Sequence, residues 1–255
     1  MSESVKCELY HDNFQNFKRY DVPKAQLVIA DIPYNCGNDF YASRPEWYVG
    51  RNTQGEESEI AHKAAFNTDF SFNIAEFMHF CTRMLKKEPD RGEKDAPCMI
   101  VFCAFQQIPE VIQQAEKYGF KKYIPLVFCK NYSPQVLKAN LRIVGAVEYA
   151  LVLYRKKLPK FRNIDENEKH HMILNWFEWK RDMNEKVRIH PAQKPIPLLR
   201  RLIEIFTDEG DVVIDPCAGS GSTLRAAKEM NRNSYGFEVS KEFYEKALSM
   251  MLNQS

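Results

Sequence analysis

The chain has 255 residues, of which 44% are hydrophobic and 13% aromatic, and its formal net charge is only +2. This length suits one large α/β domain with a continuous core, and the small net charge gives no bulk signal for nucleic acid. The first residues lack an apolar signal core, and no apolar run approaches the length of a membrane span. We therefore expect a cytoplasmic protein with no membrane partner.

The predicted elements alternate between strands and helices along the chain. In order, they are strands at 7–10 and 27–30, a helix at 72–85, a strand at 98–105, a helix at 109–118, strands at 123–129 and 146–154, a helix at 197–206, a strand at 212–214, a helix at 222–230, a strand at 234–237 and a helix at 240–252. This alternation predicts a doubly wound, mostly parallel α/β sheet of Rossmann-like type. We expect the strands at 123–129 and 146–154 to pair antiparallel at one edge of it.

Two segments interrupt this alternation. Residues 35–69 are polar and glycine-containing, which predicts a long loop of the kind that closes over a site. Residues 155–188 are basic and aromatic and fit the strand and helix pattern poorly, which predicts an insertion. The resulting division is a catalytic half at 1–154, a recognition insertion at 155–188 and a second half of the same domain at 189–255.

Seven cysteines are present, with no Cys-x-x-Cys pair, and several lie in apolar runs. The odd number and the spacing predict buried free thiols and no metal site.

The first chemical motif is Asp31-Ile32-Pro33-Tyr34, which follows the apolar strand at 27–30. A carboxylate and a backbone carbonyl can grip the two hydrogens of a planar amine and make its nitrogen more nucleophilic. Pro33 restrains Ile32 to an extended backbone and so directs the Ile32 carbonyl. Tyr34 supplies a ring on which a base rotated out of a duplex can stack. By itself the tetrapeptide is equally a turn after a buried strand.

The second motif is a glycine loop, 215–221, between the strand at 212–214 and a helix. Gly219 and Gly221 permit a tight turn and a close backbone approach, and Glu238 ends the next strand, where an acid takes ribose hydroxyls. The third glycine of the dinucleotide fingerprint is absent, with Leu224 in its place. Asp12, at the end of the first strand, is a candidate for the adenine end of a cofactor, although a lone Asp is more often a turn residue.

These two motifs and their order resemble the amino-group DNA methyltransferases of the N6-adenine and N4-cytosine type, in the arrangement with the catalytic motif first (beta-type). The resemblance covers most of the chain and implies S-adenosylmethionine as methyl donor. The segment 190–195 matches the family's segment before the cofactor loop, with Ala192 where Thr is usual. Position 32 is usually Pro, so Ile32 departs from the pattern. The cofactor-binding residues implied by the motifs and the resemblance are Asp12, Asp31, His190, Gln193, Lys194, Asp215, Pro216, Cys217, Gly219, Gly221, Thr223 and Glu238.

Double-stranded DNA is the expected partner. A basic cluster begins the insertion, and its side chains can hold phosphates, although charge alone fits a solvated loop equally well. The segment 130–134 resembles the family's loop beside the target base, and the insertion's aromatic residues equally suit a small core of its own. The DNA-binding candidates are Lys130, Asn131, Arg155, Lys156, Lys157, Lys160, Arg162, Lys180 and Arg181.

The sequence therefore predicts a site-specific, base-flipping DNA methyltransferase acting on adenine N6, because Asp31 with Tyr34 is the adenine version of the motif in the resembled family. An N4-cytosine enzyme, an RNA or protein-glutamine methyltransferase, and a DNA-binding module with a vestigial pocket remain open. C5-cytosine methylation is disfavoured, since the Pro-Cys pairs lie in the glycine loop and at a strand start. The resemblance also leaves open a homodimer and a cognate restriction endonuclease as partners.

Overall fold

The structure, a computed structural model, describes residues 5–35, 71–92, 94–131, 135–138, 143–164, 167, 169, 171–180, 189 and 193–253. The predicted loop at 35–69 therefore lies almost entirely outside the described residues. In the described part of the chain, no helix is long and apolar enough to cross a membrane.

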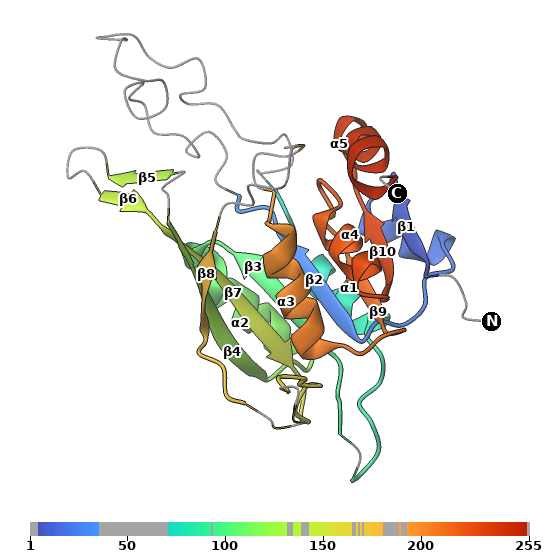
Figure 1. Cartoon of the computed structure of the whole chain (residues 1–255), viewed down its shortest axis with the longest axis vertical. Coiled ribbons are helices and arrows are strands. Elements are labelled where there is room, and N and C mark those ends of the chain that lie inside the picture. Colours follow the sequence, from blue (N-terminus) through green and yellow to red (C-terminus); the bar gives the residue numbers. More distant parts are fainter. Residues whose placement is uncertain are drawn as a thin grey trace.

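An eight-stranded sheet forms the centre of the molecule, in the order β1-β10-β9-β2-β3-β7-β4-β8 (Figure 1). Antiparallel pairing is confined to β7 and its two neighbours, β3 and β4, and every other neighbouring pair in this sheet is parallel. The bounds of the strands are β1 Cys7–Tyr10, β2 Leu27–Asp31, β3 Cys98–Cys103, β4 Lys122–Lys130, β7 Val147–Tyr154, β8 Trp176–Trp179, β9 Val212–Asp215 and β10 Asn233–Phe237. This confirms the predicted fold class.

Helices cover both faces of the sheet. One face carries the 3₁₀ helix η1 (Phe14–Arg19) with α1 (Ile74–Met84) and α2 (Ile108–Lys117), the last preceded by a short 3₁₀ turn, η4 (Phe105–Gln107). The other face carries α3 (Ile196–Phe206), α4 (Ser222–Glu229) and the C-terminal helix, whose α5 part (Lys241–Lys246) continues in a π-helical turn, η6 (Ala247–Leu252). Ser240 caps α5 by accepting a hydrogen bond from the Phe243 amide.

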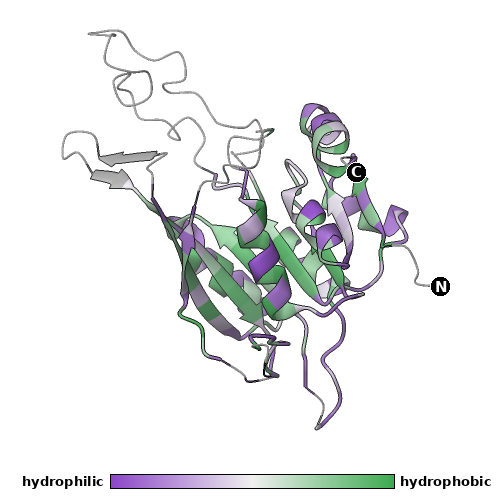
Figure 2. Cartoon of the chain, viewed as in Figure 1, coloured by the Kyte–Doolittle hydropathy of each residue, from purple (hydrophilic) through white to green (hydrophobic). Residues whose placement is uncertain are grey.

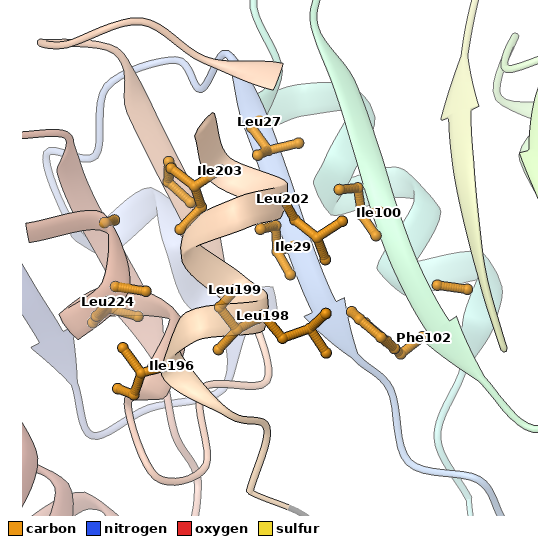
Figure 3. Close-up of a cluster of buried hydrophobic side chains, with 14 of the residues drawn as sticks. Leu27, Ile29, Ile100, Phe102, Ile196, Leu198, Leu199, Leu202, Ile203 and Leu224 are labelled. Carbon is orange, nitrogen blue, oxygen red and sulfur yellow. The ribbon is translucent and has the colours of Figure 1, made fainter. Parts of the chain in front are cut away.

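Burial explains why these segments form these elements. Residues 27–30 of β2 and all residues of β3 are apolar, as expected for strands covered on both faces, and Figure 2 shows the central strands as the most hydrophobic part of the chain. In α3, leucines and isoleucines at helical spacing face the sheet, and Figure 3 shows Leu202 directed towards the side chains of β2 and β3. At about 25 cal/mol per Å² of buried apolar surface, this contact is a major stabilising term.

Two expectations about the sheet need correction. The antiparallel strand β7 is not at the edge, because β4 and β8 continue the sheet beyond it. Residues 176–179, inside the segment predicted as an insertion, form β8, which pairs with β4 in the main sheet. A separate two-stranded sheet, β5 (Gln135–Lys138) with β6 (Ile143–Gly145), follows β4 and was not predicted.

Candidate active site

The predicted site residues gather where the parallel strands end, here called the carboxyl edge of the sheet. Asp31 ends β2 and Asp215 ends β9, two strands that pair directly, while Glu238 follows β10. Lys130 and Glu148 meet at the same edge from the antiparallel pair β4 and β7. Side chains far apart in sequence therefore converge because crossover connections return each strand to the same edge.

Asp31 is held beside Tyr34 within the predicted tetrapeptide. Its side chain is 24% exposed and accepts a 3.4 Å hydrogen bond from the Tyr34 hydroxyl, while the Ile32 amide donates to the Phe102 carbonyl. Ile32 is buried, so its side chain belongs to the core while its backbone continues the motif. Burial raises the pKa of the Asp31 carboxyl above its usual range.

Lys194 supplies the principal counter-charge to Asp31. Its ammonium lies 2.6 Å from one Asp31 carboxylate oxygen and 3.2 Å from a carboxylate oxygen of Glu148. Burial lowers the pKa of Lys194, but the two carboxylates outweigh that effect and leave the pKa above its usual value, so the lysine is charged. Lys194, which the resemblance implies as a cofactor-binding residue, thus contacts the Asp31 carboxylate.

Gln107, in the turn after β3, fixes the backbone of the tetrapeptide. Its side-chain amide donates to the Pro33 carbonyl at 2.9 Å and accepts from the Ala104 amide at 3.0 Å. The residue is buried, so the two bonds are shielded from water and define the turn. Sequence reasoning missed both Gln107 and Glu148. Only Glu148 left a local signal, as a lone carboxylate near the start of an otherwise apolar strand.

The glycine loop has the tight geometry predicted for it. Gly219 and Gly221 have φ values of 52° and 78°, in the left-handed region, and Gly221 is the N-cap of α4. The Glu238 carboxylate accepts hydrogen bonds from the Gly219 amide at 2.8 Å and the Ser240 amide at 2.7 Å. Glu238 therefore ties the loop to the end of β10, and a carboxylate with about four acceptor sites retains capacity for ligand hydroxyls.

Asp215 begins the loop as a buried carboxyl. Burial raises its pKa to about 7, opposed by hydrogen bonds from the Thr223 side chain and the Cys217 amide. The charges of Asp31 and Glu238 raise this pKa further, which shows that the three carboxylates share one electrostatic environment. Pro216 is buried in the same turn. Burial also raises the pKa of the Cys217 thiol, so this cysteine is no nucleophile at neutral pH.

Asp12 lies at the end of β1, which pairs with β10 as the order of the sheet requires. Its carboxylate accepts from the Asn13 amide, the Asn16 side chain and the Tyr20 hydroxyl, at 2.7, 2.7 and 2.8 Å. These contacts give Asp12 the role of a turn residue that holds η1 in place. Asp12 lies at the same edge of the sheet as Glu238.

Gln193 accepts a hydrogen bond from the Ile189 amide at 3.0 Å and so braces the segment that leads into Lys194. His190 and Arg181 lie outside the described residues. Within the described ranges, no group of three or more His, Cys, Asp or Glu side chains is placed to hold a metal ion. The six described cysteines are free thiols.

Most of the predicted DNA contacts lie at the opposite, amino edge of the sheet. Lys160 is buried between Asp208 and Asp211, and Arg162 pairs with Asp95 and Asp208. Asp95 precedes β3 and Asp211 precedes β9, so these ion pairs stabilise the amino ends of the two strands. Arg155, Lys156 and Lys157 follow the end of β7 at that edge, where the amides of Lys156 and Lys157 donate to Glu88.

At the carboxyl edge, the structure brings together Lys130, Asn131 and Lys180. The Lys130 side chain is 7% exposed and pairs with Glu148, so it is not free to hold a phosphate. Lys180 follows β8 and is 71% exposed. Trp179 is buried and packs with Phe177 against Phe128 of β4, so these aromatic side chains belong to the main core rather than to a core of an insertion.

The comparisons with known proteins agree with this geometry. The family described as DNA methylase matches residues 25–249. The chain is 44% identical to the type II methyltransferase M.HindIII of Haemophilus influenzae, covering 97% of this chain and 95% of that protein, and 45% identical to M2.MboI of Moraxella bovis, covering 96% and 87%. The chain belongs to the N6/N4 DNA methylase family. This methylase is therefore an S-adenosylmethionine-dependent DNA amino-methyltransferase.

Two solved structures show the same fold. The M1.HpyAVI–SAM complex is 23% identical and covers 94% of this chain and 97% of that chain, with a TM-score of 0.60. The PvuII DNA methyltransferase, described as cytosine-N4-specific, is 15% identical and covers 96% and 88%, with a TM-score of 0.64. Enzymes of this fold thus include one for cytosine, so the fold does not decide the base.

The residues at the carboxyl edge fit S-adenosylmethionine, which carries a sulfonium cation and ribose hydroxyls. The carboxylates of Asp31, Asp215 and Glu238 influence one another there, an arrangement that favours a cationic ligand. Gly219 brings its backbone close to Glu238, which is placed to accept ribose hydroxyls. The glycine loop, Asp215 and Glu238 would hold the cofactor, which would supply a methyl group at the edge where Asp31 lies.

Proposed function

We propose that this methylase is a site-specific DNA adenine-N6 methyltransferase. The observation that carries the proposal is the partly exposed Asp31 carboxylate, held beside Tyr34 at the end of β2 and next to the glycine loop. The combination of Asp31 with Tyr34 supports adenine over cytosine. So does a relative of Escherichia coli named DNA adenine methyltransferase YhdJ, which is 26% identical over 96% of this chain and 82% of that protein.

The chemistry requires a nucleophilic amine, although the exocyclic nitrogen of adenine donates its lone pair into the ring. Asp31 accepts one amino hydrogen and the Ile32 carbonyl accepts the other, which draws the nitrogen towards a tetrahedral geometry and restores its lone pair. The Gln107 bond to the Pro33 carbonyl holds this turn still while the base binds. Tyr34 stacks on the base once it has left the duplex.

When bound, S-adenosylmethionine supplies a methyl group whose bond to sulfur breaks with its electron pair remaining on sulfur. The attacking nitrogen forms the new bond to carbon and must lose a proton. Asp31 is the nearest base, and burial raises its pKa, which favours transfer of that proton to its carboxylate. The charged Lys194 ammonium, 2.6 Å away, keeps Asp31 ionised before the reaction.

The proposed organisation places the catalytic half, 1–154, before the recognition segment, 155–188, and the cofactor half, 189–255, in the beta-type order. Double-stranded DNA is the proposed substrate. The relatives named type II methyltransferases support a cognate restriction endonuclease as a partner, and a homodimer remains the proposed assembly.

The deciding experiment is expression of this chain in a host that lacks DNA methylation, followed by long-read sequencing scored for both modified bases. We expect N6-methyladenine in a single sequence motif. N4-methylcytosine in one motif would overturn the assignment of the base while keeping the amine chemistry. A soluble protein that binds cofactor and leaves the DNA unmodified would contradict the proposed activity on DNA.

Once the motif is known, Asp31→Asn tests the amine grip, because the amide has the same shape with one acceptor oxygen fewer. We expect the rate of methyl transfer to fall by at least about 10³-fold, while S-adenosylmethionine binding measured by calorimetry changes little. Near-normal turnover of this variant would show that Asp31 is not the acceptor. Asp211→Asn, at the amino edge, is the matched control for the loss of a carboxylate paired with lysine.

A further inference from the structure

Four charged side chains form an alternating row that begins with the proposed catalytic carboxylate. In order they are Asp31, Lys194, Glu148 and Lys130, contributed by β2, the segment before α3, β7 and β4. The Lys194 ammonium contacts both carboxylates, and Lys130 pairs with the other Glu148 oxygen. None of the four side chains is more than 24% exposed, so solvent screens these charges weakly.

Aromatic rings enclose the two ammonium groups of the row. Lys194 lies 4.7 Å from the centre of the Phe102 ring and 5.3 Å from that of Trp179, and Lys130 lies 4.6 Å from the Trp179 ring. These contacts leave each ammonium few directions in which to move, because ring faces attract it and the walls exclude water. The Lys194 ammonium is therefore fixed at a position between two carboxylates rather than on Asp31 alone.

An ammonium paired with Asp31 alone would weaken Asp31 as a hydrogen-bond acceptor for the target amine. Asp31 must accept a hydrogen from the target amine, and a full, close ion pair occupies its lone pairs and weakens it as an acceptor. A second carboxylate on the same ammonium divides that interaction. Burial raises the pKa of Glu148, but Lys194 and Lys130 outweigh it and hold the pKa below its usual range, so Glu148 remains an anion.

We propose that Glu148 is a positioning residue that shares the Lys194 ammonium with Asp31, so that Asp31 is anchored and ionised yet remains a strong acceptor for the amine. Glu148 acts through Lys194 and does not touch the base. The proposal rests on the proposed function, because it assigns Asp31 as the acceptor. Lys130 completes the arrangement by balancing the charge of Glu148.

Other ionisable groups face this row and interact with its charges. Those acting on Asp31 and Glu148 from the neighbouring elements are Tyr34 after β2, Cys103 at the end of β3, Asp215 at the end of β9 and Cys217 in the glycine loop. Asp215, with a pKa of about 7, is the member of this set that titrates near neutrality. The Asp31 signal must therefore be resolved separately from that of Asp215.

The experiment measures the titration of Asp31 directly, in protein labelled with ¹³C at the aspartate side-chain carboxyls. The Asp31 resonance is assigned by its loss in Asp31→Asn, and that of Asp215 by Asp215→Asn. Glu148→Gln keeps the shape and removes the anion, so we expect the pKa of Asp31 to fall by about one unit. Lys194→Met removes the cation, so we expect the pKa of Asp31 to rise by at least about one unit.

The rate of methyl transfer should follow the same directions. Transfer needs ionised Asp31 and is lost as the pH falls through its pKa, so the acid limb of kcat moves to lower pH in Glu148→Gln and to higher pH in Lys194→Met. The plateau kcat of Glu148→Gln should fall by no more than about tenfold, because the rate of proton transfer depends only fractionally on the pKa of Asp31. KM for S-adenosylmethionine should not change in Glu148→Gln.

Asp211→Asn is the matched control, since Asp211 is a 10% exposed carboxylate shared by Lys86 at 2.9 Å and Lys160 at 2.6 Å at the amino edge. It should lower thermal stability without moving the Asp31 titration. An Asp31 pKa that stays constant or rises in Glu148→Gln overturns the proposal, even if Lys194→Met fails to fold. If wild-type protein methylates no DNA while the carboxyl titration shifts as expected, the proposed function fails and the charge arrangement stands.

Discussion

At the scale of single residues, Gln107 shows how one side chain controls the direction of a catalytic turn. Its amide joins the Pro33 carbonyl to the Ala104 amide, so the motif after β2 is tied to the turn after β3. Loss of the donor would free the Pro33 carbonyl and let the neighbouring Ile32 carbonyl rotate. Because positioning errors of about 1 Å cost rates of up to about 10²-fold, the effect should appear in kcat.

We therefore predict that Gln107→Leu lowers kcat by on the order of tenfold and leaves KM for S-adenosylmethionine unchanged. Gln107→Glu keeps the oxygen that accepts from Ala104 but loses the donor to Pro33, so its kcat should fall similarly. Steady-state kinetics on a duplex with the mapped motif provide the measurement, and Gln113→Leu, on the exposed side of α2, is the control. A change in KM with constant kcat would assign Gln107 to ligand binding instead.

The sequence indicates some of these residues and conceals others for a physical reason. Asp31 and the glycine loop are recognisable because strand, turn and side-chain chemistry lie within a few adjacent positions. Gln107 and Glu148 act on residues more than 40 positions away along the chain, and nothing adjacent to them reveals the partner. Their roles exist only once β2 lies beside β3 and β4 lies beside β7 in the sheet.

At the scale of elements, the contact between α4 and β10 explains why Leu224 can replace the third glycine of the fingerprint. A small residue at that point of the fingerprint lets the helix approach the sheet closely. Here the helix α4 carries Leu224, and the small residue is Gly236 on the facing strand β10. A Cβ atom on Gly236 would lie 2.8 Å from a Leu224 methyl carbon and 3.1 Å from the Ala218 Cβ. The close contact is thus kept with the two partners exchanged.

Gly236→Ala should therefore destabilise the fold by about 1–3 kcal/mol and weaken S-adenosylmethionine binding, because it moves α4 and the loop before it. Thermal unfolding and calorimetry measure the two effects. Leu224→Ala alone creates a cavity, but combined with Gly236→Ala it should restore part of the lost stability. Additive losses in the double variant would mean that the two side chains do not compete for the same space.

The sequence predicts most strands of the sheet, but it does not predict which strands pair. Apolar runs predicted β2, β3, β7 and β9, each of which lies in the main sheet. The position of β7 between β3 and β4 depends on pairing across the sheet, which periodicity does not encode. Residues 176–179 were predicted within an insertion because their aromatic and charged residues lacked a local apolar run, whereas pairing with β4 makes them a strand.

At the scale of the whole molecule, the two edges of the sheet carry different kinds of charge. At the amino edge, most basic side chains of 155–162 are engaged within the protein: Arg155 lies over the Phe120 ring, and Lys157 donates to the carbonyls of Pro89 and Asp90. At the carboxyl edge, Lys180 is 71% exposed on the side of Asp31, and it pairs at 3.0 Å with Glu178, which is itself exposed. A base that reaches Asp31 must approach from the carboxyl edge, so phosphate contacts belong there.

The salt dependence of DNA binding tests this assignment, because each lysine that neutralises a phosphate contributes about 0.9 to the slope of log K against log salt. Lys180→Ala should therefore reduce the slope by about one, whereas replacing Arg155, Lys156 and Lys157 together with Ala should leave it unchanged despite lower thermal stability. Binding of wild-type and variant proteins to a duplex with the mapped motif at several salt concentrations gives the slopes. A slope reduced by about three in the triple variant and unchanged in Lys180→Ala would instead place the duplex on the amino edge, where it could not deliver a base to Asp31.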